Sequence, residues 1–144
     1  MSKKSKILVI IQFTIFAYFI LSGRIIADSI WFFIQILGFI ISLWSIIVMK
    51  IGNFNIQPEV KTAAIFKTNG PYAIIRNPMY IGIILFFVAA LISNYSSLHL
   101  SAFTLLVIVL LEKIALEEIF LSERFGNAYF KYKKKTYRLI PFIY

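Results

Sequence analysis

The chain has 144 residues, a formal net charge of +9, one histidine and no cysteine, and 60% of its residues are hydrophobic. This content exceeds the roughly 45–50% apolar residues of soluble domains, and the mean hydropathy of the chain is +0.86. We therefore expect a single membrane-embedded domain over residues 1–144. With no cysteine and only His99, disulfides, thiolate nucleophiles and His/Cys zinc sites are excluded, and we expect no metal.

Four apolar segments follow in chain order, each near the length of about 20 residues that a helix needs to cross a bilayer. Because lipid offers no partner for free backbone groups, each is predicted to be a helix, and the fold an all-α polytopic membrane protein. The first helix is expected to continue to Ile26, with Arg24 reaching the interface. The fourth is expected to run into a charged, amphipathic C-terminal segment. The segments are residues 7–21, 29–49, 78–93 and 98–116.

Basic residues flank these segments unevenly. One side carries only Arg24, next to Asp28, and a turn with His99, which is expected to be a solvated loop residue. By the positive-inside rule, both termini and the middle connection are predicted to be cytoplasmic. This layout favours membrane lipids as partners and argues against nucleic acid. The basic residues of the cytoplasmic side are Lys3, Lys4, Lys6, Lys50, Lys61, Lys67, Arg76, Arg124, Lys131, Lys133, Lys134, Lys135 and Arg138.

The stretch "GPYAIIRNPMYIG" leads into the third segment and has two interpretations. In the first, Asn77 caps the helix and Pro78 is its first residue, which leaves Arg76 as one more cytoplasmic cation. In the second, the free N–H groups and positive dipole of this helix end bind an anionic group together with Arg76. Tyr72 and Tyr80 would then supply aromatic faces and hydroxyls to a ligand.

A second polar stretch begins where the fourth helix leaves the membrane. Glu117 and Glu118 are costly near bilayer depth unless they are paired or used. Gly126 is predicted to end the helix, and Tyr129 and Tyr132 follow on the amphipathic segment. The lysines of that segment are best explained as anchors to anionic lipid headgroups. They are Lys131, Lys133, Lys134 and Lys135.

Together the two stretches resemble the membrane methyltransferase family that contains isoprenylcysteine carboxyl methyltransferases and phospholipid N-methyltransferases. The resemblance covers roughly residues 65–143, and Asn77 stands where the best-known members carry histidine, so an acid–base role there is not expected. The shared residues are Gly70, Pro71, Tyr72, Arg76, Pro78, Tyr80, Gly82, Glu117, Glu118, Leu121, Phe125, Gly126, Tyr129, Tyr132, Ile140 and Pro141.

The resemblance implies a membrane methyltransferase that uses S-adenosylmethionine at the cytoplasmic face. It implies cofactor-binding roles for Tyr72, Arg76, Asn77, Pro78, Tyr80, Gly82 and Glu117, and catalytic roles for Glu118 and Arg138. A lipophilic acceptor would enter between the third and fourth helices.

The chemistry of the acceptor stays open at this point. An isoprenylcysteine-like carboxylate would be its own nucleophile and would need a cation such as Arg138. A phospholipid amine would need a base such as Glu118 or a tyrosine. Two further alternatives are an inactive membrane interaction protein and a reductase related to sterol reductases, which share a similar Arg-x-Pro-x-Tyr block.

Overall fold

A computed structural model describes residues 3–49 and 66–144, and every regular element in these ranges is helical. This confirms the predicted all-α membrane fold. The elements are α1 (Lys3–Leu21), α2 (Ser29–Met49), the short 3₁₀ helix η1 (Gly70–Ala73), α3 (Pro78–Ser93), α4 (Ser97–Phe125) and α5 (Asn127–Lys133). Lys50 and Lys61, which entered the prediction of orientation, lie outside the described residues.

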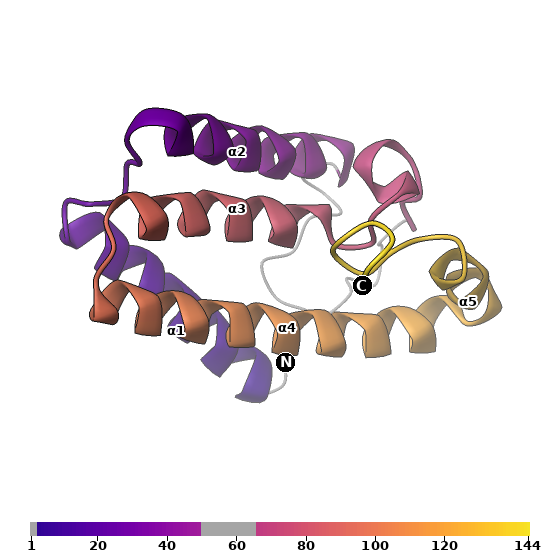
Figure 1. Cartoon of the computed structure of the whole chain (residues 1–144). Coiled ribbons are helices and arrows are strands. Elements are labelled where there is room, and N and C mark those ends of the chain that lie inside the picture. The colour runs from indigo at the N-terminus through magenta and orange to yellow at the C-terminus, as the bar shows by residue number, and fades with distance from the viewer. Residues whose placement is uncertain (1–2, 50–65) are drawn as a thin grey trace.

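The helices form two pairs, α2 with α3 and α1 with α4 (Figure 1). The α1–α2 connection and the α3–α4 turn lie at one end, which we call the turn end. The start of α3, the end of α4, α5 and η1 lie at the other, which we call the site end (Figure 1). Long-range contacts thus bring both polar stretches of the sequence to the same end of the bundle.

Three helices, α1, α2 and α4, are long and apolar enough to cross a membrane, and α3 is a shorter apolar helix. At 1.5 Å per residue, the 16 residues of α3 span about 24 Å, whereas the 29 residues of α4 span about 43 Å. The two helices share the turn end, so the longer α4 extends past the start of α3 at the other end (Figure 1). It is also longer than the hydrocarbon core, which is about 30 Å thick. The site end therefore has a step in height between these two helices.

Small residues let α2 and α3 approach closely, as in many membrane helix pairs. A Cβ atom built on Gly82 would lie 2.2 Å from Ser42 Oγ and 2.6 Å from the carbonyl oxygen of Gly38. Neither glycine can therefore carry a side chain without moving the helices apart. The main core lies between the pairs and includes Phe19, Tyr80, Phe87, Leu106, Leu110, Ile114 and Leu139.

The predicted extension of the first helix to Ile26 is wrong, because α1 ends at Leu21. Gly23 has a φ of +67°, a conformation that breaks the helix. Gln35 on α2 then holds the following segment, donating to the Ile25 carbonyl at 2.7 Å and accepting from the Ala27 N–H at 3.0 Å. The connection is therefore a fixed loop rather than a longer helix.

The prediction that His99 is a solvated loop residue is also wrong. His99 is 4% exposed and lies in the first turn of α4, where Ser96 caps the helix by accepting from its backbone N–H at 3.1 Å. Its Nδ1 lies 2.5 Å from Ser96 Oγ and 3.3 Å from the Tyr18 hydroxyl. The cap starts α4 earlier than hydropathy indicates, and α1 covers the ring.

Candidate functional site

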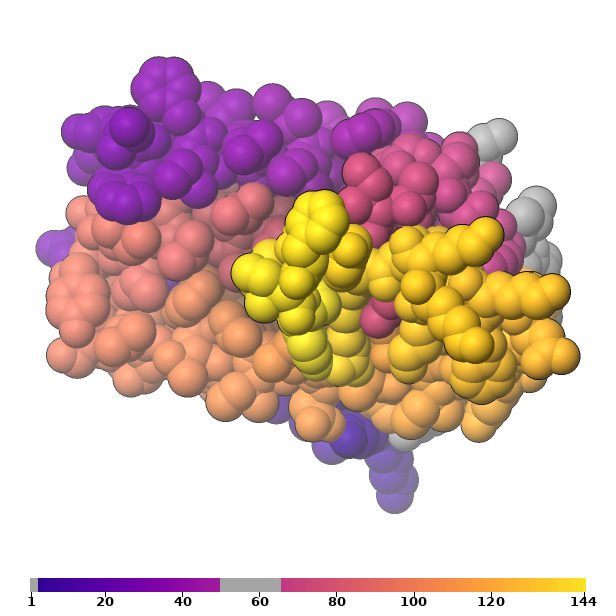
Figure 2. Space-filling view, turned by 45° about the vertical axis from the view of Figure 1, so that its right-hand side comes forward, coloured from indigo at the N-terminus to yellow at the C-terminus, as the bar shows by residue number. Residues whose placement is uncertain are grey.

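The residues after α5 lie across the start of α3 and the flank of α4, as the yellow segment in Figure 2 shows. Ile75 and Tyr137 form an isolated parallel bridge. The Arg76 N–H donates to the Tyr137 carbonyl at 2.8 Å, and the Tyr137 N–H donates to the Ile74 carbonyl at 2.9 Å. The site end is therefore built from both polar stretches, joined by backbone hydrogen bonds.

Asn77 occupies the predicted N-cap position, and Pro78 is the first residue of α3. The side chain of Asn77 does not cap the helix, however. It donates instead to the Arg138 carbonyl at 3.0 Å and is 6% exposed. A neutral amide at this position thus ties the C-terminal segment to α3, a task that needs a donor but no titratable proton.

Glu118 is the electrostatic centre of this end. Its carboxylate lies 3.0 Å from Arg76 Nε, 3.3 Å from Lys133 Nζ and 3.5 Å from Arg138 Nε. The side chains of Arg76 and Glu118 are each 9% exposed, and that of Arg138 is 22% exposed. One carboxylate faces three cations, so the cluster carries an excess of positive charge.

Arg76 also holds the segment that follows α5. Its Nη1 donates to the Lys133 carbonyl at 3.1 Å and to the Thr136 carbonyl. These bonds use the fixed, planar fork of the guanidinium, which a lysine lacks. Arg76 thus connects the start of α3, the carboxylate on α4 and the backbone after α5.

Glu117 is the neighbour of Glu118 in sequence, but it points into a different environment. It accepts a hydrogen bond at 3.1 Å from the hydroxyl of Tyr80, a residue that is 4% exposed on α3. Glu118 is thus paired with cations, whereas Glu117 is bonded to a neutral hydroxyl. The two adjacent carboxylates are therefore suited to different tasks.

Aromatic side chains form one wall of the site end. Phe66 stacks on Phe125 with ring centroids 5.1 Å apart and meets the edges of Tyr129 and Tyr132 at 5.9 and 5.0 Å. The Tyr132 hydroxyl donates to the Tyr72 carbonyl at 2.6 Å. α5 thus packs its tyrosines against η1 and α4 rather than exposing them.

The hydroxyl groups in this wall stay protonated at neutral pH. Burial raises the pKa of Tyr132 to about 12, and it raises the pKa of Tyr72 and Tyr129 further above their usual value. Tyr129 is 1% exposed, and its hydroxyl has no hydrogen-bond partner in the described part of the chain. A buried hydroxyl of this kind can bond a polar ligand group or a water molecule.

Of the residues predicted for the site, all but one lie at the site end. They are Tyr72, Arg76, Asn77, Pro78, Tyr80, Glu117, Glu118 and Arg138. Gly82 lies apart from them, on the face of α3 that packs against α2. Its place in the structure is explained by helix packing alone.

The structure adds residues that the sequence did not single out for the site. Lys133, predicted to face lipid headgroups, also pairs with Glu118, and its side chain is 44% exposed. Tyr129 and Tyr132 line the site, and their spacing of three on an amphipathic helix could have indicated a common inward face. In contrast, the backbone of Thr136, which accepts from Arg76, leaves no signal in the sequence.

Comparison with known proteins gives one family. The model of the phospholipid methyltransferase family matches residues 28–128, more than two thirds of the chain. The matched range includes Arg76, Glu117 and Glu118, and it leaves out α1 and Arg138. A comparison with curated proteins gave no match.

Proposed function

Because this chain belongs to the phospholipid methyltransferase family, we propose that it transfers a methyl group from S-adenosylmethionine to a lipophilic acceptor at the cytoplasmic face of a membrane. The observation that carries the proposal is the unequal pair of carboxylates at the site end. Glu118 is held by three cations, and Glu117 accepts a bond from a neutral hydroxyl. Lys113 also acts electrostatically on Glu117, but Glu117 faces fewer cations than Glu118 and is therefore the carboxylate available to a cationic ligand group.

The side chains present fit the polar groups of S-adenosylmethionine, which are an ammonium, a carboxylate and ribose hydroxyls. Glu117 would pair with the ammonium or the ribose, and the unpartnered hydroxyl of Tyr129 would bond a further polar group. Tyr72 and Tyr80 would supply the surrounding walls. Arg76 and Asn77 would hold the C-terminal segment in place over the cofactor.

The cofactor supplies an activated methyl group, so alignment and exclusion of water are the main tasks left to the protein. Well-oriented reactants can gain roughly 7–11 kcal/mol from positioning alone. The Glu118 carboxylate is already engaged in ion pairs with Arg76, Lys133 and Arg138. Its task in this proposal is to orient Arg76 and Arg138.

The excess positive charge around Glu118 favours an acceptor with an anionic head. A carboxylate is its own nucleophile and needs a cation rather than a base, and Arg138 is partly exposed at the edge of the cluster. An isoprenylcysteine-like carboxylate is therefore our first candidate. A phospholipid amine is the second, because the phosphate beside its amine would meet the same cations.

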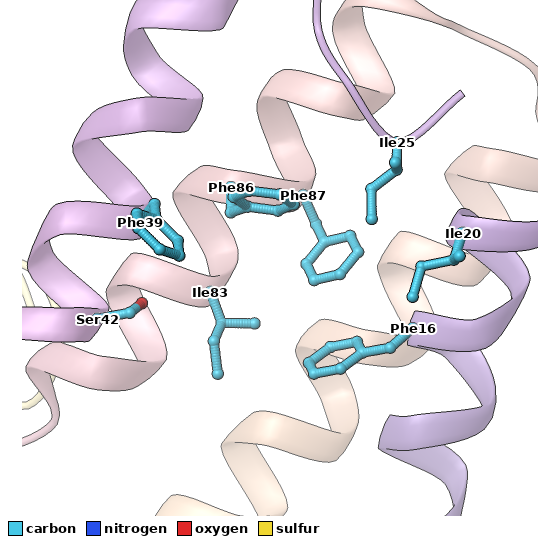
Figure 3. Close-up of a pocket in the computed structure, with 8 residues that line it drawn as sticks. All are labelled: Phe16, Ile20, Ile25, Phe39, Ser42, Ile83, Phe86 and Phe87. Carbon is cyan, nitrogen blue, oxygen red and sulfur yellow. The ribbon is translucent and has the colours of Figure 1, made fainter. Parts of the chain in front are cut away.

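An apolar cavity of about 240 Å³ lies between α1, α2 and α3 rather than between α3 and α4 (Figure 3). This is smaller than the roughly 300–1,000 Å³ of whole-ligand pockets, and it suits a length of hydrocarbon chain. Ser42 on its wall also bonds the Met79 carbonyl at 3.5 Å, next to Tyr80. We therefore assign the chain of the acceptor to this cavity. Its walls are Phe16, Ile20, Ile25, Phe39, Ser42, Ile83, Phe86 and Phe87.

The test is to incubate the purified protein and a native lipid extract with methyl-labelled S-adenosylmethionine. Label in the organic phase that mild base releases as a volatile product identifies a methyl ester, and base-stable label identifies a methylated amine. If no label is transferred and the cofactor does not bind, the proposal fails in favour of an interaction protein. A preference for a nicotinamide cofactor would favour the reductase instead.

A further inference from the structure

A lysine is buried inside the helix bundle beneath the site. Lys113 on α4 is 1% exposed and lies four residues, about one turn, before Glu117. Ionisable side chains at such depth are costly and are normally paired or functional. A leucine or methionine would fill the same space without that cost, so packing alone does not explain the lysine.

The contacts of Lys113 join three helices. Its Nζ donates to Gln12 Oε1 of α1 at 2.6 Å, and Gln12 is itself 5% exposed. The same ammonium lies 5.6 Å from the centroid of the Tyr80 ring on α3. Tyr80 in turn donates its hydroxyl to Glu117 at 3.1 Å. A continuous set of contacts thus runs from α1 to the carboxylate assigned to the cofactor.

The order of these contacts gives each member a role. A cation over the ring of a tyrosine is attracted to the π electrons and draws density from the hydroxyl, which strengthens the hydroxyl as a donor. Gln12 fixes the ammonium over the ring. The positive charge of Lys113 also offsets the negative charge of Glu117 inside an apolar bundle.

We propose that Gln12 and Lys113 are positioning residues for methyl transfer, which hold the Tyr80 hydroxyl and the Glu117 carboxylate in the orientation that receives the cofactor. α1 is thereby a working part of the site, although it lies outside the residues that match the family. Neither residue contacts the substrate in this scheme. The inference rests on the proposed function, because it assigns the cofactor to Glu117.

The experiment compares two buried glutamines. Gln12→Leu removes one partner of Lys113, and Gln35→Leu removes a similarly buried amide, 2% exposed, that bonds backbone groups at the turn end. Lys113→Met removes the charge, and Lys113→Arg retains it. Each variant is purified as the full chain and measured for unfolding temperature, affinity for S-adenosylhomocysteine, and kcat and KM of methyl transfer.

We expect Lys113→Met to weaken S-adenosylhomocysteine binding about tenfold, and Gln12→Leu about threefold to tenfold, with a matching fall in kcat. Lys113→Arg should recover part of the loss. Gln35→Leu should lower the unfolding temperature as much as Gln12→Leu but leave the affinity for S-adenosylhomocysteine within about twofold. Cofactor affinity is the control readout, because Gln35 bonds the backbone of Ile25 and Phe86 in the cavity assigned to the acceptor.

Two results would overturn the inference while the wild type binds cofactor and transfers methyl. One is that Lys113→Met and Gln12→Leu bind and react like the wild type. The other is that Gln35→Leu binds S-adenosylhomocysteine as weakly as Gln12→Leu, which would make the effect one of stability alone. A wild type that binds no cofactor would instead remove the proposed function, on which this inference rests.

Discussion

The two ends of the bundle both bury polar side chains, but they bond them differently. At the turn end, the neutral amides of Gln35 and Asn94 bond backbone groups of the connection between α1 and α2. At the site end, charged side chains from the segment before α3, from α4, from α5 and from the segment after α5 bond one another around Glu118. Hydrogen bonds between side-chain amides and the backbone fix the loop, and these neutral amides offer no charge to a ligand. At the site end, three cations face the one carboxylate of Glu118, and an anionic ligand group can balance the excess positive charge.

The largest effect is expected from removing the charge at the centre of the site end. Glu118→Gln leaves three cations facing a neutral amide, and losing one member of a buried ion pair costs about 3–5 kcal/mol. We expect methyl transfer to fall below a hundredth of wild type and the C-terminal segment to become sensitive to protease. Rate assays and limited proteolysis measure the two effects.

The matched control for this change is Gln35→Leu at the turn end. It should leave the C-terminal segment as resistant to protease as in the wild type. A Glu118→Gln protein that kept both its rate and its protease resistance would contradict the central role given to Glu118.

An intermediate effect is expected at Gly82, which the sequence assigned to the cofactor and the structure places against α2. Gly82→Ala should destabilise the fold by about 1–3 kcal/mol, because the new methyl group meets a backbone oxygen of Gly38 that cannot rotate away. Helix propensity gives back at most about 1 kcal/mol. Chemical unfolding of the purified protein measures the net loss.

Cofactor affinity decides between the two roles of Gly82. With packing as its role, the folded fraction of Gly82→Ala should bind S-adenosylhomocysteine within about threefold of wild type. A variant of unchanged stability with much weaker binding would restore Gly82 to the cofactor site.

The smallest effect compares two asparagines, one at each end of α3. Asn77 donates to the Arg138 carbonyl at 3.0 Å, and Asn94 donates to the Ile26 carbonyl at 3.2 Å. Each alanine variant should lose about 1 kcal/mol of stability, the usual value of one hydrogen bond. Only Asn77→Ala should also slow methyl transfer, by about twofold to fivefold, when both are assayed side by side. Equal rates for the two variants would mean that the tie to Arg138 serves stability alone.

Hydropathy and capping residues were sufficient to predict both bounds of α3 and the first residue of α2, because each is an apolar run with a clear boundary, such as Asn77 followed by Pro78. It failed at Ile26, because the end of α1 depends on Gly23 and on a bond from Gln35 in the next helix. It failed at His99 for a related reason, since burial there comes from Tyr18 and Phe19 of α1.

The candidate site was predictable as a set of residues but not as an arrangement. Both motifs were visible, and the structure brings them to one end. Which carboxylate is paired with cations could not be predicted, because Lys133 reaches Glu118 from α5, and Arg138 reaches it only after the chain turns back beyond α5. The bond between Gln12 and Lys113 joins residues 101 positions apart, and no local pattern indicates it.

The bridge between Ile75 and Tyr137 has a consequence for the order of events during synthesis. Residues 136–139 close the site, and they are made after every helix of the bundle. Entry of the apolar helices α1 to α4 into the membrane and completion of the site are therefore separate in time. A chain that is still being made can be embedded in the bilayer while Glu118 lacks its partner Arg138.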